Sequence, residues 1–360
     1  MLKKDTRYYI STINLKSKAT IYDLLDRLSL LEKAKNKNRK LFSKLYNTYL
    51  GSSSLKFNDS FSTEYTTYCF FSKASDLQQH VLFDSEGVAM CMNDAPKIHK
   101  NPLLPAYFAL TCYNDFLLNK DTESLQKFWN QTSHLEKIGE HRNNCFFLNY
   151  LDDLPMFEVK APWFAGITQG LCASVFCRAY YISKKEVFKQ KARQSLEAMF
   201  IPLEKGGIFC KTSDGFDWIE EYPSESRRSL VLNGFIFSII AVCEFLILCE
   251  KDKIFEKRLH RLIESLFKTF HHYKFGQYLK YSQYSKSFQN ISYQGLVICQ
   301  FLHLFELTNN KAFKELATML NQNMNWHAYF RLYEMATPEH FKPFYLKFDN
   351  SFILKSKNEK

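Results

Sequence analysis

Hydrophobic and polar positions follow a pattern that repeats four times along residues 103–322. Each unit has a mainly apolar segment of helical length, a short polar break, and a second segment whose apolar residues recur every three to four positions. That spacing places apolar side chains on one face of a helix, so each second segment predicts an amphipathic helix. The predicted helix pairs cover residues 103–118 and 123–135, 164–182 and 185–200, 230–248 and 253–270, and 293–307 and 311–322.

The second helices of the four units align on one apolar position, occupied by Leu125, Phe188, Phe255 and Phe313, at intervals of 63, 67 and 58 residues. The fourth residue after each is again apolar: Trp129, Ala192, Leu259 and Ala317. Helical hairpins that cannot bury an apolar face alone are stabilised by stacking on their neighbours. The pattern therefore predicts a mainly α fold, an α/α toroid that is complete or incomplete, with the first helices inside and the second helices outside.

The longest apolar run, residues 229–249, has about the length of a bilayer span, roughly 20 residues. It contains Asn233 and Glu244, however, and an ionisable group at membrane depth costs about 2.5 to 3.5 kcal/mol. Three other segments hold the same place in the repeat without its length or apolarity. The pattern favours a buried inner helix over a membrane span.

The segments between the hairpins have strand and turn character. Residues 206–222 contain Asp214-Gly215, a hairpin signal, and residues 273–284 are rich in tyrosine. Both precede a first helix, so their side chains are expected at one mouth of the toroid. We expect the toroid over residues 81–323, a separate N-terminal helical and β region over 1–80, and a C-terminal extension over 324–360.

The composition of the chain indicates what kind of partner it binds and in which compartment it is expected. The formal net charge is +11, and a positive potential attracts polyanions. The ten cysteines are scattered singly, several within apolar segments, which favours reduced core thiols over a disulfide framework. The first 25 residues lack the apolar core of a secretory signal, so a cytosolic location is expected.

Two long motifs resemble the C-terminal catalytic domain of the D-glucuronyl C5-epimerases. WIEEYPSESRRSLVLNGFIFS, residues 218–238, is similar to that family's W-Y-E-E-Y-P followed by V-L-N-G-F-x-[FY]-S. PWFAGITQGLCASVFCRAY, residues 162–180, is similar to its W-[YF]-S-x-M-A-Q-G-x-x-x-S-x-x-x-R-A-Y. Shorter similarities extend the resemblance, in order, over roughly residues 80 to 322.

The resemblance implies an α/α toroid and inversion at C5 of a glucuronate unit within a polymer, giving iduronate, with no cofactor. Removal of a C5 proton α to a carboxylate builds an enediolate, and a second group must protonate the opposite face. By position, the family's catalytic residues fall on Glu221, Tyr281 and Tyr293. The substrate contacts that the same motifs imply are Tyr222, Glu220, Gln169, Asn233 and Arg227.

This chain departs from the family at the closing motifs. Where the family has Y-D-L-R, residues 281–284 read YSQY, and where it has Y-H-x-x-H, residues 293–297 read YQGLV. The arginine that would neutralise the substrate carboxylate is therefore absent from its usual place. Lys280, Lys286 and Arg227 are the candidates to replace it.

Three hypotheses remain open from the sequence: a uronate C5-epimerase, a polysaccharide lyase or hydrolase on the same toroid, and a glycan-binding protein without catalysis. The expected partner is an acidic polysaccharide or uronic-acid glycan, with no nucleic acid and no membrane span; a homodimer is left open. His271-His272 has no acidic or thiol partner at ligand spacing, so the sequence predicts a polar helix end and no metal site.

Overall fold

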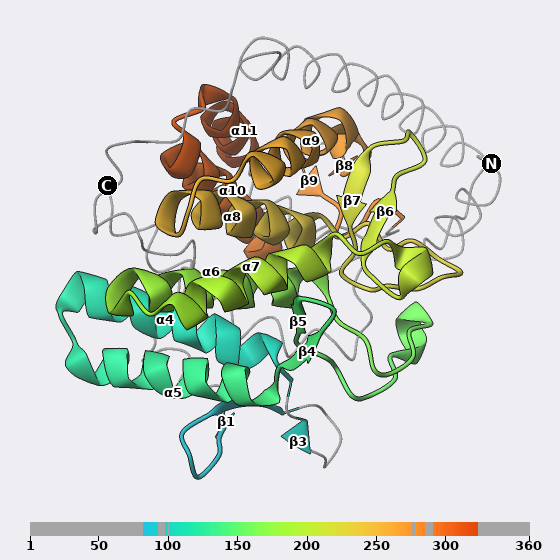
Figure 1. Ribbon diagram of the computed structural model, residues 1–360. Helices are drawn as coiled ribbons and strands as arrows, with labels where there is room; N and C mark the ends of the chain where they lie inside the picture. Colours follow the sequence, from blue (N-terminus) through green and yellow to red (C-terminus); the bar gives the residue numbers. More distant parts are fainter. Residues whose placement is uncertain (1–81, 93–97, 100, 276–277, 285–290, 323–360) are drawn as a thin grey trace, which may run out of the picture.

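The computed structural model describes residues 82–322, apart from 93–97, 100, 276–277 and 285–290 (Figure 1). This part forms helical hairpins in chain order: α4 (Leu103–Asn119) with α5 (Thr122–Ile138), α6 (Gly166–Ser183) with α7 (Glu186–Met199), α8 (Leu232–Leu248) with α9 (Lys253–Thr269), and α10 (Ile291–Thr308) with α11 (Lys311–Gln322). The predicted fourfold repeat is confirmed. The regions expected over residues 1–80 and 324–360 lie outside the described residues.

The hairpins form two layers. The first helices pack side by side in the order α4, α6, α8, α10, and each second helix packs on the first helix of its own hairpin. In Figure 1 the hairpins are stacked from α4–α5 at the bottom to α10–α11 at the top. In α8 every residue except Ile247 is buried, whereas α9 buries one face only. This is the layering of an α/α toroid, so the predicted fold class is confirmed.

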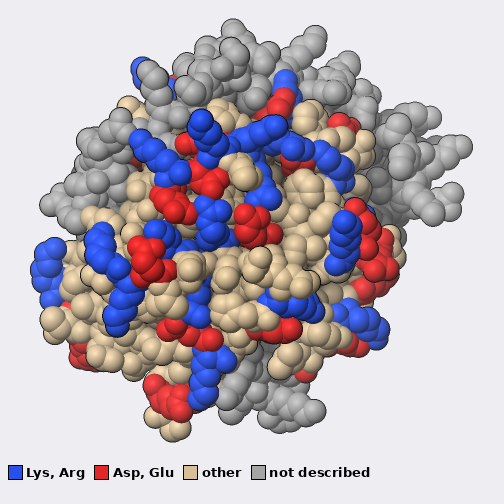
Figure 2. Space-filling model, in the orientation of Figure 1, with Lys and Arg blue, Asp and Glu red and all other residues tan. Residues whose placement is uncertain are grey.

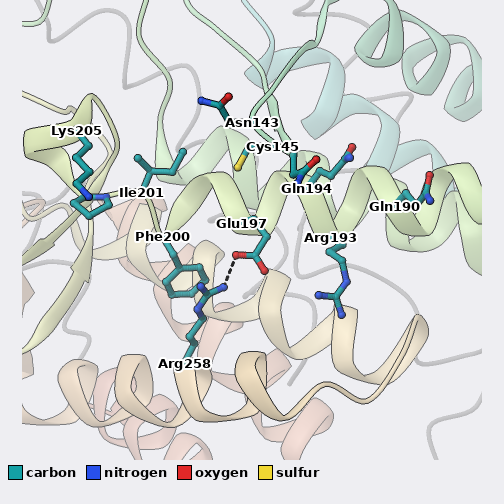
Figure 3. Close-up of a pocket in the computed structure, with 12 residues that line it drawn as sticks. Asn143, Cys145, Gln190, Arg193, Gln194, Glu197, Phe200, Ile201, Lys205 and Arg258 are labelled. Atoms are coloured by element: carbon teal, nitrogen blue, oxygen red, sulfur yellow. Dashed lines mark hydrogen bonds and ion pairs between the residues drawn. The ribbon is translucent and has the colours of Figure 1, made fainter.

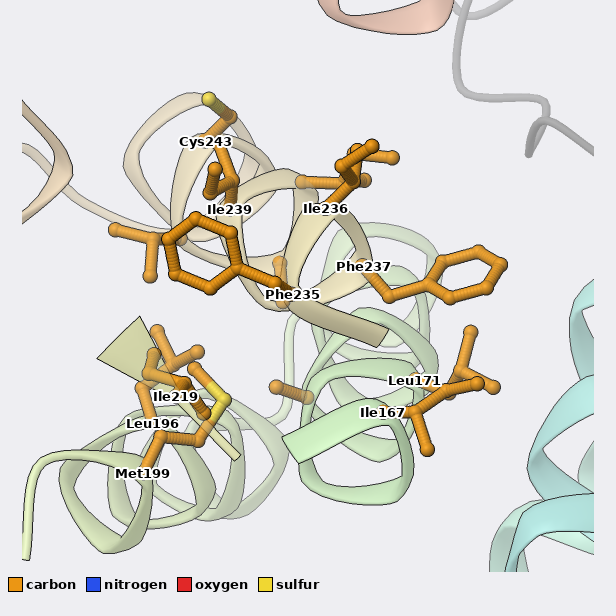
Figure 4. Close-up of a cluster of buried hydrophobic side chains, with 14 of the residues drawn as sticks. Ile167, Leu171, Leu196, Met199, Ile219, Phe235, Ile236, Phe237, Ile239 and Cys243 are labelled. Carbon is orange, nitrogen blue, oxygen red and sulfur yellow. The ribbon is translucent and has the colours of Figure 1, made fainter. Parts of the chain in front are cut away.

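Close helix approach in the inner layer depends on small residues. A Cβ atom added to Gly170 of α6 would lie 3.1 Å from the backbone oxygen of Phe237 of α8. Beside this contact, Figure 4 shows Ile167 and Leu171 of α6 next to the Phe237 ring. All three side chains are buried. Burial of this kind stabilises the fold by about 25 cal/mol per Å² of apolar surface.

The apolar run of residues 229–249 forms α8, which begins at Leu232 and lies inside the helical layers. Its place in the repeat is therefore the predicted one. Among the described helices, none combines the length and the apolarity that a membrane crossing requires.

Short antiparallel hairpins precede the inner helices. They are β4 (Glu140–Arg142) with β5 (Cys145–Phe147), β6 (Phe209–Lys211) with β7 (Asp217–Ile219), and β8 (Lys274–Phe275) with β9 (Tyr278–Leu279). Gly215 takes φ +82° in the predicted β6–β7 turn. The three hairpins gather at one end of the helix stack, at the right of Figure 1, which we call the mouth. A further sheet, β1 (Leu82–Phe83), β2 (Ala89–Met92) and β3 (Ile98–His99), packs on α4.

A buried ion cluster lies far from the mouth in the inner layer. Arg178 of α6 donates two hydrogen bonds to Glu244 of α8, at 2.7 and 2.8 Å, and His303 of α10 lies 3.1 Å from the same carboxylate. Each is the twelfth residue after the first of its helix, so the repeat places them in one layer, about 18 Å along the helices. The cluster links three inner helices.

Eight of the cysteines in the described residues are seen as free thiols, and six of these are buried. This agrees with the expected core thiols. Cys172 is an example: burial holds the pKa of its thiol well above the usual range, so it stays protonated.

Candidate active site

The carboxylate segment Glu220–Glu221 is fixed by the strand before it. Strand β7 ends at Ile219, and the Trp218 ring stacks on Phe235 of α8 with centroids 3.7 Å apart. Trp218 is fully buried. The two glutamates that follow lie beyond the end of the strand, and each has its own set of contacts.

Glu221 and Tyr281 are brought together from positions 60 residues apart. The Tyr281 hydroxyl donates a hydrogen bond of 2.9 Å to Oε1 of Glu221, and it lies 3.0 Å from the Tyr222 hydroxyl. The backbone of Tyr281 is fixed too, since its carbonyl accepts from the Leu232 N–H at 3.2 Å at the start of α8. The sequence predicted all three residues for the site, and here they form one hydrogen-bonded chain.

The Glu221 carboxyl group is held in a poorly solvated place. Burial raises its pKa to about 7, against the hydrogen bond from Tyr281, which lowers it. Its Oε2 atom is buried and has no hydrogen-bond partner among the described residues. A carboxyl group that titrates near neutral pH is suited to accept and release a proton.

Gly234 of α8 makes room for this carboxyl group. A Cβ atom at Gly234 would lie 2.3 Å from Oε2 of Glu221, well inside contact distance. The glycine of the N-G-F motif therefore has a steric reason, which the sequence pattern alone does not reveal.

We expect Gly234→Ala to lower the free energy of unfolding by about 1 to 3 kcal/mol, the usual effect of overpacking. At an unobstructed helix position the same change stabilises by about 0.5 to 1 kcal/mol. Urea unfolding measures the difference. In a Glu221→Ala background the carboxyl group is gone, so Gly234→Ala should no longer destabilise; equal losses in both backgrounds would contradict the steric account.

Aromatic rings surround the Glu221–Tyr281 contact. Tyr293 packs edge-on against Tyr281 with ring centroids 5.6 Å apart, and its side chain is 38% exposed. Tyr222 stacks on Phe157 at 3.7 Å and lies 6.2 Å from Trp163. Phe157 and Trp163 were not predicted as site residues; Trp163 stands in a quoted motif, whereas Phe157 has no sequence signal. Flat rings of this kind are suited to stack on the apolar face of a sugar.

Glu220 has a different role from the predicted substrate contact. Its fully buried carboxylate accepts hydrogen bonds from the Ser229 N–H and hydroxyl and from the Leu230 N–H. Leu230 adopts a left-handed φ of +48°, and its carbonyl accepts a 2.7 Å hydrogen bond from Tyr273. Glu220 thus closes the loop between the carboxylate segment and α8. Burial also raises its pKa to about 7.

The three remaining residues predicted to contact the substrate lie in different environments. Gln169 is fully buried and bonds the backbone of Leu148 and Phe146, so its amide holds β5 on α6 instead of facing a substrate. Asn233 is buried in the first turn of α8, and its Oδ1 has no partner among the described residues. Arg227 lies exposed in the loop before α8.

The described residues hold no group of three or more His, Cys, Asp or Glu side chains arranged for a metal ion. His271-His272 lies in a short 3-10 helix, η4 (Phe270–His272), where the predicted polar helix end is found. Nδ1 of His271 is 3.0 Å from the Lys268 carbonyl, and Nε2 of His272 is 3.1 Å from Asp214.

Residues 142–322 match the family described as "D-glucuronyl C5-epimerase C-terminus". The chain belongs to this family. The matched range contains the whole Glu221–Tyr281 cluster and both motifs that carry the resemblance. A curated relative, the "Uncharacterized protein MJ1128" of Methanocaldococcus jannaschii, is 26% identical over 110 residues, which are 29% of this chain and 35% of that protein. The match thus spans about a third of that relative's length.

Two solved structures are similar at low identity. Cellobiose 2-epimerase from Spirochaeta thermophila DSM 6192 has a TM-score of 0.48 and 12% identity, covering 80% of this chain and 85% of that one. A family 76 glycoside hydrolase from a bovine Bacteroides thetaiotaomicron strain has a TM-score of 0.46 and 11% identity, covering 80% and 68%. At this level they say nothing about the site.

Proposed function

We propose that the protein is an isomerase that inverts C5 of a glucuronate unit within an acidic polysaccharide, giving iduronate. The observation that carries the proposal is the hydrogen bond between Tyr281 and Glu221, a carboxyl group whose burial raises its pKa to about 7. Family membership supports a carbohydrate-modifying enzyme, and the cluster supplies the acid and base groups that the C5 reaction needs.

In the proposed mechanism Glu221 is the base and Tyr281 relays the proton. Oε1 of Glu221 faces Tyr281 and Oε2 faces Gly234, whereas Tyr281 is only partly buried and is the more accessible of the two. The Tyr281 oxygen takes the C5 proton as its own proton passes to Glu221, which leaves an enediolate on the sugar. Tyr222 holds the Tyr281 hydroxyl at 3.0 Å.

Reprotonation requires an acid on the other face of the sugar ring. We assign it to Tyr293, the second catalytic tyrosine that the family resemblance implies, because its side chain is exposed in the first turn of α10. Helices α6, α8 and α10 all begin at the mouth. The N-terminus of a helix stabilises nearby negative charge by about 0.3 to 1 kcal/mol. These dipoles, with Arg227, would partly replace the arginine that the chain lacks.

The substrate, compartment and assembly are parts of the same proposal. A net charge of +11 favours an acidic glycan, and free buried thiols are usual in a reducing compartment, which supports a cytosolic location. We keep nucleic acid outside the proposed partners, and we leave a homodimer open.

Incubation of a glucuronate-containing polymer with the protein in deuterated water tests the reaction, because epimerisation places deuterium at C5. Since Glu221 must be ionised to accept the proton, the rate should rise about tenfold per pH unit below pH 7 and level off above it. Mass spectrometry and NMR measure the incorporation. New absorbance from an unsaturated uronate would indicate a lyase instead, and binding without exchange would indicate a non-catalytic glycan-binding protein.

A further inference from the structure

A cavity lies outside the Glu221–Tyr281 cluster. It has a volume of about 710 Å³, within the usual range of small-molecule sites, and we call it the rim pocket. Its lining comes from the β4–β5 turn, one face of α7, the loop that follows α7, and Arg258 of α9 (Figure 3). Nothing in the proposed reaction uses these residues.

Carboxamides give the rim pocket its chemistry. Asn143, Asn144, Gln190 and Gln194 line it, and none of their side chains has a hydrogen-bond partner among the described residues. A carboxamide both donates and accepts, which matches the adjacent hydroxyl groups of a sugar ring. Gln190 and Gln194 are four residues apart and so share one face of α7.

The charged groups of the rim pocket are held in place. Arg258 donates to Glu197 at 2.7 Å, with its guanidinium 4.3 Å from the centre of the Phe200 ring, and Arg193 bonds Glu250 at 2.7 Å. Each pair leaves guanidinium N–H groups in excess, because arginine has five donors. Lys205 is exposed and has no acidic partner among the described residues.

The surroundings of the rim pocket make its single unpaired lysine significant. On the face that carries α7 and α9, basic and acidic side chains are interleaved (Figure 2). Because charges of both signs alternate on this surface, it does not attract polyanions over its whole area. Lys205, which has no acidic partner among the described residues and lies beside the carboxamides, instead offers a local site for one carboxylate.

Backbone hydrogen bonds connect the loop that lines the rim pocket to the segment that carries Glu221. The Ile201 carbonyl, in the loop that lines the pocket, accepts from the Phe209 N–H at 2.9 Å, and Phe209 pairs with Ile219 of β7. Two strand spacings are about 10 Å, and Glu221 follows two residues after Ile219. A glycan chain of a few sugar rings spans this separation.

We propose that the rim pocket is a second glycan site, which holds a uronate-containing part of the same polymer a few sugars from the residue being epimerised. Carboxamides would bind its hydroxyl groups and Lys205 a carboxylate. This inference rests on the proposed function for the choice of glycan. Its consequence is that long oligosaccharides bind more tightly than short ones.

Calorimetric titration of glucuronate-containing disaccharides and dodecasaccharides tests the rim pocket, because a disaccharide at the Glu221–Tyr281 cluster is too short to reach it. The titrations use full-length protein carrying Glu221→Gln, so that turnover does not interfere. We expect Gln194→Ala with Lys205→Ala to weaken dodecasaccharide binding about ten- to hundredfold, the loss of one neutral and one charged hydrogen bond, and to leave disaccharide binding unchanged. The matched control, Gln126→Ala with Lys253→Ala, removes the same groups from α5 and α9 outside the pocket and should change neither.

Two results would overturn the proposal: dodecasaccharide affinity unaffected by the pocket variant, or a neutral dodecasaccharide that binds the unchanged pocket equally well. Thermal unfolding of each variant confirms that the lining changes leave the fold intact. The two proposals fail separately. Absence of C5 exchange would remove the proposed reaction, whereas the length-dependent loss of binding reports on the rim pocket alone.

Discussion

Replacing Glu221 by Gln is expected to lower the rate of C5 hydrogen exchange by about 10²- to 10⁴-fold, the usual effect of losing an acid or base group. The amide keeps the shape and still accepts the 2.9 Å hydrogen bond from Tyr281 through its oxygen, but it cannot take the proton that Tyr281 passes on. Incorporation of deuterium at C5, followed by mass spectrometry under single-turnover conditions, gives the rate.

The control is Glu225→Gln, which makes the same change of charge at an exposed position of the same loop and should leave the rate within about twofold. Glu220→Gln is unsuitable as a control, since its carboxylate closes the loop onto Ser229 and Leu230. Tyr293→Phe should lower the rate as much as Glu221→Gln, whereas Tyr284→Phe, at another exposed tyrosine, should not. Exchange that survives Glu221→Gln would place the base on a different residue.

The fold could be predicted because its inner helices are apolar all round and its outer helices are amphipathic, and each class has its own pattern. The alignment of the repeat predicted the buried positions of the outer helices less well. In α9, Phe255 and Leu259 are both buried, as predicted, but in α5 the fully buried aromatic residue is Phe128, one position before Trp129. Trp129 instead packs on Phe188 of the next outer helix, at 5.7 Å. Contacts between hairpins decided this position, and a single helix pattern does not contain them.

Only the site residues that lie in the family motifs could be predicted from the sequence. The resemblance placed Glu221 and Tyr281 together although 60 residues separate them, and the structure joins them by a hydrogen bond. It assigned Glu221 the catalytic role and Glu220 a substrate contact, and the sequence did not reveal that the Leu230 backbone bonds the Glu220 carboxylate. It also gave Gln169 a substrate contact, although backbone groups use both ends of its amide.

The largest loss of stability is expected from substitutions in the ion cluster of α6, α8 and α10. Removing one partner, as in Arg178→Met, takes both arginine hydrogen bonds from the buried Glu244 carboxylate, leaves it with His303, and should lower the free energy of unfolding by about 3 to 5 kcal/mol. Arg178 also lies over the Tyr113 ring of α4, at 5.7 Å, so all four inner helices contact the cluster. The surface control is Lys160→Met. Its ion pair with Asp153 is largely exposed, and its loss should change stability by no more than about 1 kcal/mol.

The pH dependence of unfolding gives the cluster a signature of its own. Despite burial, which acts to raise it, pairing with Arg178 and His303 lowers the pKa of Glu244 to about 2, so this contribution is present above the unfolded value of about 4.5 and is lost as pH falls towards 2. Burial acts to lower the pKa of His303, but Glu244 and Glu306 hold it above the usual range. That contribution is therefore present below about pH 6.5 and is lost as pH rises through the folded value.

Replacing all three charged groups at once distinguishes a specific ion cluster from simple loss of packing. With Arg178→Met, Glu244→Leu and His303→Leu together, no buried charge is left unpaired, and similar exchanges elsewhere have been neutral or stabilising by up to about 4 kcal/mol. We expect the triple variant to regain most of the stability that Arg178→Met loses and to lack the pH dependence of the cluster. Urea unfolding from pH 3 to pH 9 measures both. A triple variant as unstable as the single one would mean that Arg178 contributes through packing on Tyr113, and not through its charge.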